Sequence, residues 1–314
     1  MNEYDIIALL TKVAGRLPRE YSPIGDDVEA LETFPGRLIL KADMLVGRTD
    51  VPPGMTWRQV ARKAVAMCVS DFAAKGVEPR AFMVSLGIPR KMQATDIRGL
   101  AAGFRDAIDE WGIHLVGGDT SECDDLVIDC ILTGFAERYV TRDGARTGEL
   151  VVVTGDFGTT SAGLKILLEG ARSTPEFGRI AKRNVYHPEP RLELGMALSN
   201  LLSSSMDSSD GLAICLHTLE EMSGVGMRID SLPYRKELEG FAKLNGYRLE
   251  ELVLFGGEEY EIVGTIPKER LAEAKAVARS MGSELRVIGE TTKARSIMGP
   301  SGRPIPKRGW IHLA

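Results

Sequence analysis

Apolar residues recur at helical spacing in several stretches of the chain. From residue 3 to residue 17 they lie three or four positions apart, which predicts a short amphipathic helix. A longer helix is expected from Thr56 to Lys75, with Thr56 suited to cap its start and Gly76 suited to end it. Further helices are expected at 93–112, after the glycine-rich loop at 154–164, at 191–204, after the turn at 206–211 and at 272–281.

Short apolar segments separate these helices and predict strands. In the first half they lie at 37–43, 81–89, 113–119 and 126–137, and in the second half from residue 151 and at 228–234, 260–267 and 284–290. Both halves therefore follow one broad order, which is a strand, an acid-bearing loop and a helix. The polar, glycine-containing stretch at 141–150 between them predicts a domain boundary.

Composition, charge and cysteine pattern narrow the class of protein. The 314 residues suggest two domains or one large one, and a hydrophobic content of 44% is enough for a substantial core. The net charge of −5 argues against a general nucleic-acid binder, which needs a basic field. No apolar run approaches the roughly 18 residues of a membrane helix, so no membrane partner is expected. Four scattered cysteines without a CxxC pair argue against a disulfide framework or a zinc site and favour a cytoplasmic location.

Acidic residues recur where the predicted apolar segments end. They are Asp26, Asp27, Asp43, Asp71, Asp119, Asp207, Asp210, Glu258 and Glu259. Carboxylates gathered in one place would repel one another unless a cation neutralised them, and an all-oxygen ligand set favours Mg²⁺ or Ca²⁺. Mg²⁺ commonly combines a few carboxylates with substrate phosphates, so a nucleotide partner is expected. Each element alone has a plainer explanation, since a Gly-Asp-Asp is often a solvated turn and Asp207 with Asp210 could begin a helix.

The glycine-rich loop at 154–164 follows a predicted strand and opens a predicted helix. Backbone N–H groups in such a loop can hold a phosphate, helped by the helix dipole. The loop matches neither the P-loop pattern nor the spaced glycines of a dinucleotide fold, and an ordinary strand-to-helix turn explains it equally well. No Ser-His-Asp or Cys-His arrangement can be argued, so covalent catalysis has no obvious nucleophile.

Taken together and in order, the motifs resemble the thiamine-monophosphate kinase family. The segments that carry the resemblance are GDD at 25–27, KADMLV at 41–46, the helix-forming stretch at 61–82, LVGGDTSE at 115–122, TRDGARTGE at 141–149, TGDFGTTSAGL at 154–164, SMDSSDGLA at 205–213, GGEEYEI at 256–262 and IGE at 288–290. More widely, the chain is similar to the ATP-binding superfamily of aminoimidazole ribonucleotide synthetase.

The resemblance implies ATP-dependent phosphorylation of thiamine monophosphate to thiamine diphosphate. The γ-phosphoryl group would pass directly to the substrate's phosphate, so alignment and charge neutralisation matter more than a protein nucleophile. Two polyphosphates must approach each other, and several Mg²⁺ ions are therefore expected.

The resemblance also implies roles for individual residues. The metal-ligand positions are Asp27, Asp43, Asp71, Asp119, Asp207 and Asp210, the ATP-contact positions are Gly118, Asp119, Arg142 and Ser209, and the substrate-contact positions are Asp50, Glu258 and Trp310. The planar fork of Arg142 suits a phosphate. Trp310 could stack on the cationic thiazolium ring, although a tryptophan near a terminus could equally serve packing alone.

The sequence departs from the bacterial pattern of this family in three places. Lys41 and Ala42 stand where small hydroxyl residues usually help to bind metal, which leaves the number of Mg²⁺ sites open and allows Lys41 to replace one cation electrostatically. Asp50 stands where a substrate-contacting histidine is usual, and Glu259 replaces an aspartate in GGEDYE. These differences resemble the archaeal branch of the family.

The implied architecture is α+β with two domains, each a mixed or antiparallel sheet covered by helices. The N-terminal ATP- and metal-binding domain is expected at 1–142 and the C-terminal domain, which completes the nucleotide and substrate site, at 143–314. The family dimerises through its N-terminal sheets, so a homodimer is expected. Apolar alternation in the strands at 37–43 and 126–134 is compatible with this.

Other functions remain open at this point. Selenophosphate synthetase would need a reactive cysteine near the N-terminus, and the hydrogenase-maturation protein of this superfamily a C-terminal one, whereas the first and last cysteines here are Cys68 and Cys215. An enzyme similar to aminoimidazole ribonucleotide synthetase is harder to exclude. A non-catalytic ATP-binding regulator would bind ATP with Mg²⁺ and form no ADP when thiamine monophosphate is added.

Overall fold

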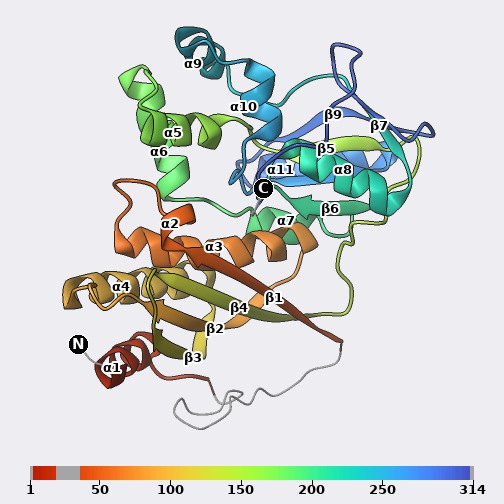
Figure 1. Ribbon diagram of the computed structural model, residues 1–314. Helices are drawn as coiled ribbons and strands as arrows, with labels where there is room; N and C mark the ends of the chain where they lie inside the picture. Colours follow the sequence, from red (N-terminus) through yellow and green to blue (C-terminus); the bar gives the residue numbers. More distant parts are fainter. Residues whose placement is uncertain (1–2, 19–35, 312–314) are drawn as a thin grey trace. The chain divides into compact units, whose positions relative to one another are not determined.

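The computed structural model describes residues 3–18 and 36–311, which form two compact units. The first unit comprises residues 1–72 and 77–138, and the second residues 73–76 and 139–314. Each unit contains one β-sheet packed with helices (Figure 1), so the predicted α+β class is confirmed. None of the helices in the described ranges has the length and apolarity needed to cross a bilayer.

The first unit is built on a mixed sheet of four strands in the order β1-β4-β2-β3. Strands β1 and β2 each pair with β4 in antiparallel fashion, and β2 pairs with β3 in parallel. The strands are β1 (Arg37–Val46), β2 (Pro79–Ile88), β3 (His114–Glu122) and β4 (Val127–Ala136). The helices are α1 (Glu3–Ala14), α2 (Gly47–Asp50), α3 (Trp57–Lys75) and α4 (Ala94–Trp111).

One face of this sheet is buried by α3 and α4 (Figure 1). The side chains that face the helices alternate along the strands with period two, as in β4, where Ile128 and Leu132 are fully buried. The rings of Phe82 on β2 and Phe104 on α4 meet in this core, with centroids 6.4 Å apart. Gly103 lets α4 lie close to α3, because a Cβ at this position would come within 2.1 Å of the carbonyl oxygen of Arg58.

Helix α3 begins and ends where the sequence predicts. The backbone N–H of Gln59 donates to Thr56 Oγ1 (3.3 Å), and the backbone N–H of Thr56 donates to Gln59 Oε1 (2.9 Å). This reciprocal pair is a capping box, which satisfies two backbone donors at the helix start. Gly76, with φ of +65°, stops the helix, and its N–H donates to the carbonyl of Ala73 (3.1 Å).

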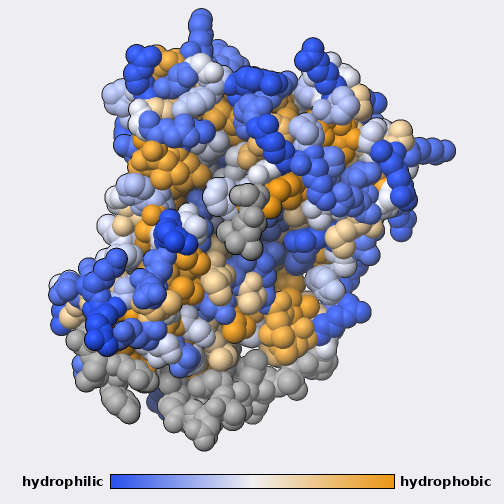
Figure 2. Space-filling model, viewed as in Figure 1, coloured by the Kyte–Doolittle hydropathy of each residue, from blue (hydrophilic) through white to orange (hydrophobic). Residues whose placement is uncertain are grey.

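The opposite face of the first sheet carries exposed apolar side chains, and we call it the open face. On β1, Leu38, Leu40 and Met44 expose 51%, 62% and 55% of their surface, and alternation puts all three on this face. Hydrophobic side chains are visible along β1 in Figure 2. Apolar side chains gathered on a sheet face are typical of a surface that another protein covers.

The second unit is built on a six-stranded sheet in the order β10-β7-β9-β5-β8-β6, antiparallel except for the pair β10 and β7. The strands are β5 (Leu150–Thr154), β6 (Ser204–Asp207), β7 (Gly226–Ile229), β8 (Ile262–Ile266), β9 (Leu285–Thr292) and β10 (Ile297–Met298). The helices are α5 (Thr159–Glu169), α6 (Pro175–Tyr186), α7 (Leu192–Leu198), α8 (Leu212–Ser223), α9 (Glu237–Asn245), α10 (Leu249–Phe255), a short 3-10 turn (Lys268–Arg270) and α11 (Leu271–Ser280).

The main core of the second unit lies between this sheet and helices α5, α6, α8, α9 and α10. Val151 and Val153 of β5 belong to it, and Phe177 of α6 contacts Phe241 of α9 with ring centroids 5.5 Å apart. Val152, between the two valines, is also buried and faces the other way. Strand β5 is therefore buried on both sides, which explains its unbroken apolar run.

Some predicted elements differ in extent, and others were missed. The helix predicted at 191–204 ends at Leu198, because Ser204–Asp207 pairs with β8 as strand β6. Helices α6, α9 and α10 and strand β10 were not predicted. Helix α6 begins at Pro175 after a Thr174 cap, which is a sequence signal for a helix start, but its many charged residues obscure the apolar spacing.

Candidate active site

In the first unit, the structure brings two predicted metal ligands together around a lysine. Lys41 and Asp43 are two positions apart on β1 and so face the same side, toward Asp71 on α3. The Nζ of Lys41 lies 3.1 Å from Asp43 Oδ1 and 2.8 Å from Asp71 Oδ2. One ammonium thus bridges two carboxylates that would otherwise repel each other.

Burial governs the electrostatics of this cluster. Loss of water raises the pKa of Asp43 to about 6, the charge of Asp71 adds to the rise, and the charge of Lys41 opposes it. Burial alone would lower the pKa of Lys41, but Asp71 and Asp43 together outweigh it and raise that pKa. Lys41 therefore remains positively charged in this site.

Asp119 lies on the opposite face of the same sheet. It is aligned with Ser85 of β2. Ser85 is aligned with Asp129 of β4, and Asp129 is aligned with Met44 of β1. Met44 directly follows Asp43, so it faces the other side of the sheet. A single chain consequently presents Asp119 on the open face, whereas Asp43 faces α3.

Gly118 permits the close pairing of β2 with β3 just before Asp119. A Cβ at this position would come within 2.0 Å of the carbonyl oxygen of Val84. Any other residue would push the two strands apart, so the glycine has a structural reason in addition to its predicted contact with ATP.

Asp50 and the Gly-Asp-Asp motif complete the predictions for the first half. One carboxylate oxygen of Asp50 accepts a hydrogen bond from the backbone N–H of Val46 (2.7 Å) and so closes the turn of α2. Its carbonyl oxygen accepts from the Nζ of the buried Lys63 (3.0 Å). Asp26 and Asp27 lie outside the described residues.

In the second unit, three loops meet at the residues between β6 and α8. The N–H of Glu258 donates to the carbonyl of Ser209 (2.7 Å), and the N–H of Trp310 donates to the carbonyl of Asp210 (3.0 Å). These backbone bonds bring together one predicted ATP contact, one predicted metal ligand and both predicted substrate contacts of this half. Asp207 ends β6 immediately before this junction.

Glycine and backbone strain shape this junction. A Cβ on Gly257 would come within 2.5 Å of the carbonyl oxygen of Ser209, so only glycine allows the loops to meet. Glu258 and Tyr260 have φ of +62° and +53°, the left-handed region that non-glycine residues seldom adopt. Such a conformation costs on the order of 1–3 kcal/mol and is typical of functional sites.

Glu259 holds the start of α5 from the neighbouring loop. Its carboxylate accepts from the N–H of Gly158 (2.6 Å) and from Thr160 Oγ1 (2.9 Å). Burial raises the pKa of Glu259 to about 8, although these hydrogen bonds oppose the rise. A protein carboxylate therefore takes the helix-start donors that a phosphate would need, so the glycine-rich loop is explained as a strand-to-helix turn.

Arg142 lies in the same region as Asp207 and Asp210. Burial raises the pKa of the Cys215 thiol, and the charge of Asp207 raises it further. Asp210 adds to this rise, and the positive charge of Arg142 opposes it. The three charged side chains are thus close enough to act on one buried thiol. The carbonyl of Arg142 accepts from Ser223 Oγ (3.1 Å), which fixes the backbone of its loop.

Comparisons with known proteins fit this geometry. The family model described as AIR synthase related protein, N-terminal domain, matches residues 25–136, and the corresponding C-terminal domain matches 146–298. Thiamine-monophosphate kinase of Nitrosopumilus maritimus is 37% identical over 100% of this chain and 99% of its own length. The chain belongs to the thiamine-monophosphate kinase family.

Two further comparisons extend this finding. Thiamine-monophosphate kinase of Pyrococcus abyssi is 33% identical over 100% of this chain and 96% of its own length. The solved structure of AaThiL complexed with AMPPCP and TMP has a TM-score of 0.81 at 29% identity, over 99% of this chain and 97% of that one. The match to the Nitrosopumilus relative agrees with the predicted archaeal branch of the thiamine-monophosphate kinase family.

In this thiamine-monophosphate kinase family member, side chains on α8 and α10 hold the segment that carries Trp310. His217 on α8 contacts the carbonyl oxygen of Ile305 through Nε2 (2.9 Å). The Nζ of Lys307 donates to both carboxylate oxygens of Glu221 (2.7 and 2.8 Å). Arg308 pairs with Glu251 of α10 and lies over the ring of Phe255, 4.3 Å from its centroid. Trp310 itself is 52% exposed at the end of this segment.

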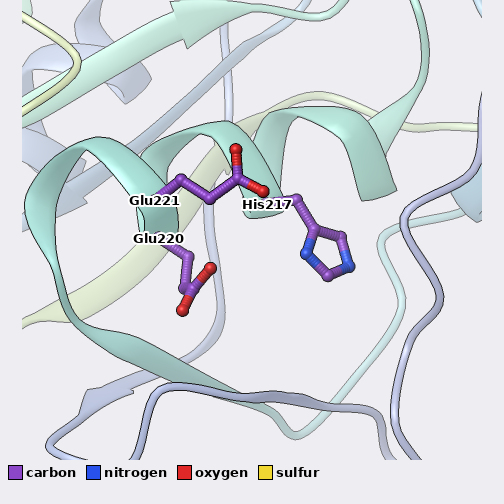
Figure 3. A group of neighbouring side chains, drawn as sticks. All are labelled: His217, Glu220 and Glu221. Atoms are coloured by element: carbon purple, nitrogen blue, oxygen red, sulfur yellow. The ribbon is translucent and has the colours of Figure 1, made fainter.

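The same α8 side chains include a group with metal-like spacing. His217, Glu220 and Glu221 lie on neighbouring turns, with ligand atoms within 4.8 Å of one another (Figure 3). Lys307 already pairs with Glu221, and the ring of His217 contacts a backbone carbonyl. These contacts explain the group, because they help to keep the C-terminal segment in place.

The sequence did not predict one partly buried ion pair near this junction. Arg191 donates to both carboxylate oxygens of Glu261 (2.9 and 2.6 Å), and Thr154 Oγ1 donates to the same carboxylate (2.7 Å). The N–H of Ser208 donates to the carbonyl of Glu261 (2.9 Å), so the pair supports the loop after Asp207. The only available clue was the final acid of GGEEYE, whose partner is 70 residues away.

Proposed function

We infer that this chain is an ATP-dependent kinase that phosphorylates thiamine monophosphate to thiamine diphosphate. The observation that carries this conclusion is a match to thiamine-monophosphate kinases over the entire chain, at 37% and 33% identity. The structural likeness to a protein solved with AMPPCP and TMP supports ATP as the phosphoryl donor. The junction of Ser209, Asp210, Glu258 and Trp310 supports a shared site for nucleotide and substrate in the second unit.

We propose that several Mg²⁺ ions assist the reaction. The proposed ligands are Asp27, Asp43, Asp71, Asp119, Asp207 and Asp210. Their donors are all carboxylate oxygens, which fit a hard cation. When bound, Mg²⁺ neutralises the charge of the phosphates that must approach each other.

The chain's own residues would bind and orient the two substrates. We assign Gly118, Asp119, Arg142 and Ser209 to ATP, and Asp50, Glu258 and Trp310 to thiamine monophosphate. Arg142 can donate two parallel hydrogen bonds to a phosphate, and the exposed indole of Trp310 can stack on the thiazolium ring. The transfer would be direct and in line, because alignment contributes most to phosphoryl transfer and needs no covalent intermediate.

We propose a homodimer formed through the open face of the first sheet. Leu38, Leu40 and Met44 supply its exposed apolar surface, and Asp119 shares the face. A partner that covers this face would then lie beside a proposed metal and ATP residue. We further propose residues 1–142 as the ATP- and metal-binding domain that dimerises, residues 143–314 as the domain that completes the site, and the cytoplasm, where ATP is made, as the location.

The deciding experiment is an assay with ATP, MgCl₂ and thiamine monophosphate, in which product is identified by chromatography. We expect thiamine diphosphate and ADP in equal amounts, and only when all three components are present. Binding of ATP without product would contradict the assignment. Product with an aminoimidazole ribonucleotide precursor would then indicate a different enzyme of the superfamily, and no turnover with either substrate would indicate a regulator.

A further inference from the structure

Lys41 lies between two proposed metal ligands. Its Nζ is 3.1 Å from Asp43 Oδ1 and 2.8 Å from Asp71 Oδ2, so one ammonium joins strand β1 to helix α3. The three side chains are mostly buried, with exposed fractions of 32% for Lys41, 24% for Asp43 and 16% for Asp71. An ion pair with so little solvent access is held more firmly than a surface pair.

We propose that Lys41 is a built-in cation that takes the place of one divalent metal ion between Asp43 and Asp71. The inference rests on the proposed function, because that function assigns both carboxylates to the metal site. It adds that the site is already partly neutralised by the chain and holds one Mg²⁺ fewer than the same site with a small residue at position 41.

The lysine and a metal ion would compete for the same two oxygens. Mg²⁺ needs its oxygen ligands at roughly 2.0–2.1 Å and in near-octahedral order. The ammonium already donates hydrogen bonds to both oxygens, and a metal ion between them would overlap it. Moving Lys41 aside would leave its charge without partners in a partly buried place, which costs free energy.

The exchange of a metal ion for lysine has a chemical consequence. Two carboxylates and one ammonium keep a net charge of −1, whereas two carboxylates and Mg²⁺ would be neutral. An ammonium has three N–H donors, and the two carboxylates do not use all of them. Lys41 can therefore donate to an anionic ligand such as a phosphate oxygen while it stays paired.

Direct counting of bound metal tests this proposal without any turnover. We would titrate the full-length protein with Mn²⁺ in the presence of a non-hydrolysable ATP analogue and measure free Mn²⁺ by electron paramagnetic resonance. We expect Lys41→Ser to bind one more Mn²⁺ per chain than the unchanged protein. Lys41→Arg, which keeps a cation at this place, should bind the unchanged number. Equal counts for the unchanged protein and Lys41→Ser would overturn the proposal.

Two further variants test where the additional metal ion binds. Adding Asp71→Asn to Lys41→Ser should remove the extra ion, which would locate it between β1 and α3. Lys91→Met, at an exposed lysine of the same unit, should leave the count unchanged. If the extra ion persists without Asp71, it binds elsewhere and the proposal is wrong.

A second readout covers the case in which Lys41→Ser is unstable without metal. The melting temperature of Lys41→Ser should rise more steeply with added Mn²⁺ than that of the unchanged protein, because its extra ion binds the folded state. An equal rise would overturn the proposal. Both readouts are independent of the kinase assay. A failure to make thiamine diphosphate would therefore reject the proposed function, and the metal count would still test the role of Lys41.

Discussion

Glu259 shows how one residue can differ in role from its motif. It belongs to a stretch that resembles a substrate-binding motif, yet its half-buried carboxylate accepts hydrogen bonds from Gly158 and Thr160 at the start of α5. The negative charge near a helix start is favourable, whereas its burial is not. Burial prevails and raises the pKa of Glu259 to about 8.

This raised pKa predicts a pH dependence of stability. The folded chain keeps the proton up to about pH 8, whereas an unfolded glutamate loses it near 4.5. Between these values the folded state binds more protons, so the free energy of unfolding should fall as the pH rises. We expect urea unfolding at pH 5.5 and pH 8.5 to show a smaller pH difference in Glu259→Gln than in the unchanged protein. The exposed Glu269→Gln should leave the difference as it was, and an equal loss in both variants would contradict the prediction.

Gly257 shows that a site can require the absence of a side chain as strictly as it requires a charge. The carbonyl of Ser209 lies 2.5 Å from the place where a Cβ would stand, and the next residue, Glu258, is held at a positive φ by its hydrogen bond to that same carbonyl. A methyl group here would push the loop away from Ser209 and change the direction of the Glu258 side chain.

We therefore predict that Gly257→Ala destabilises the protein by about 1–3 kcal/mol and raises KM for thiamine monophosphate, because overpacking displaces the loop. Gly240→Ala is the matched control. Gly240 lies in the exposed part of α9 with open space around its Cβ position, so alanine there should stabilise by about 0.5–1 kcal/mol. Urea unfolding and substrate kinetics measure both effects, and similar behaviour of the two variants would refute the steric argument.

Helix α3 combines a start that is set locally with a contact that only packing creates. Its capping box fixes where the helix starts, and Asp71, in its C-terminal half, pairs with Lys41 of β1, which also pairs with Asp43. The pattern Thr-x-x-Gln is local, so the sequence alone predicts it. The meeting of Asp71 with β1 depends on how the helix packs on the sheet, which no local pattern contains.

Loss of this cap should weaken the first unit without removing activity. We expect Thr56→Ala to lower the free energy of unfolding by about 1 kcal/mol, because the backbone donor of Gln59 loses its partner. Thr56→Ser keeps the hydroxyl and should retain most of the stability. Thermal unfolding measures the difference, and kcat at low temperature should change little in either variant. Equal stability of the two variants would argue against the capping role.

At the scale of the whole molecule, the exposed apolar side chains on the open face of the first sheet need an explanation. It combines three exposed apolar residues of β1 with Asp119, a proposed ligand of metal and ATP. Exposed apolar side chains of this kind are costly in a monomer and are usually covered by a partner. The proposed second copy of the chain would cover the apolar side chains of β1 and would lie beside Asp119.

Leu40→Glu tests this at the centre of the face. A charge among apolar side chains should prevent association, so we expect a monomer by light scattering at micromolar concentration, where the unchanged protein should be a dimer. Leu168→Glu is the matched control, because Leu168 is 63% exposed in the second unit, close to the 62% of Leu40. A monomer for the unchanged protein, or a dimer for Leu40→Glu, would contradict the proposed interface.

The α+β class was expected only because the ordered motifs resemble a known family. Most of the strands and the capped helix α3, by contrast, were predicted from the residues alone. These follow from local chemistry, since apolar periodicity, a cap and a stop glycine act within a few residues. The same reasoning failed for α6, α9 and α10, whose short, charged or glycine-bearing sequences depend on packing for their helical state.

The use of the acidic residues depends on the tertiary structure. It paired Lys41 with both Asp43 and Asp71, turned Asp119 to the opposite face, and gave Glu259 to the start of α5. It also joined Glu258 to Ser209 and Trp310 to Asp210. The partners in most of these contacts are tens of residues apart in sequence. Their meeting depends on strand register, helix packing and glycines that admit a close approach, and a motif contains none of these.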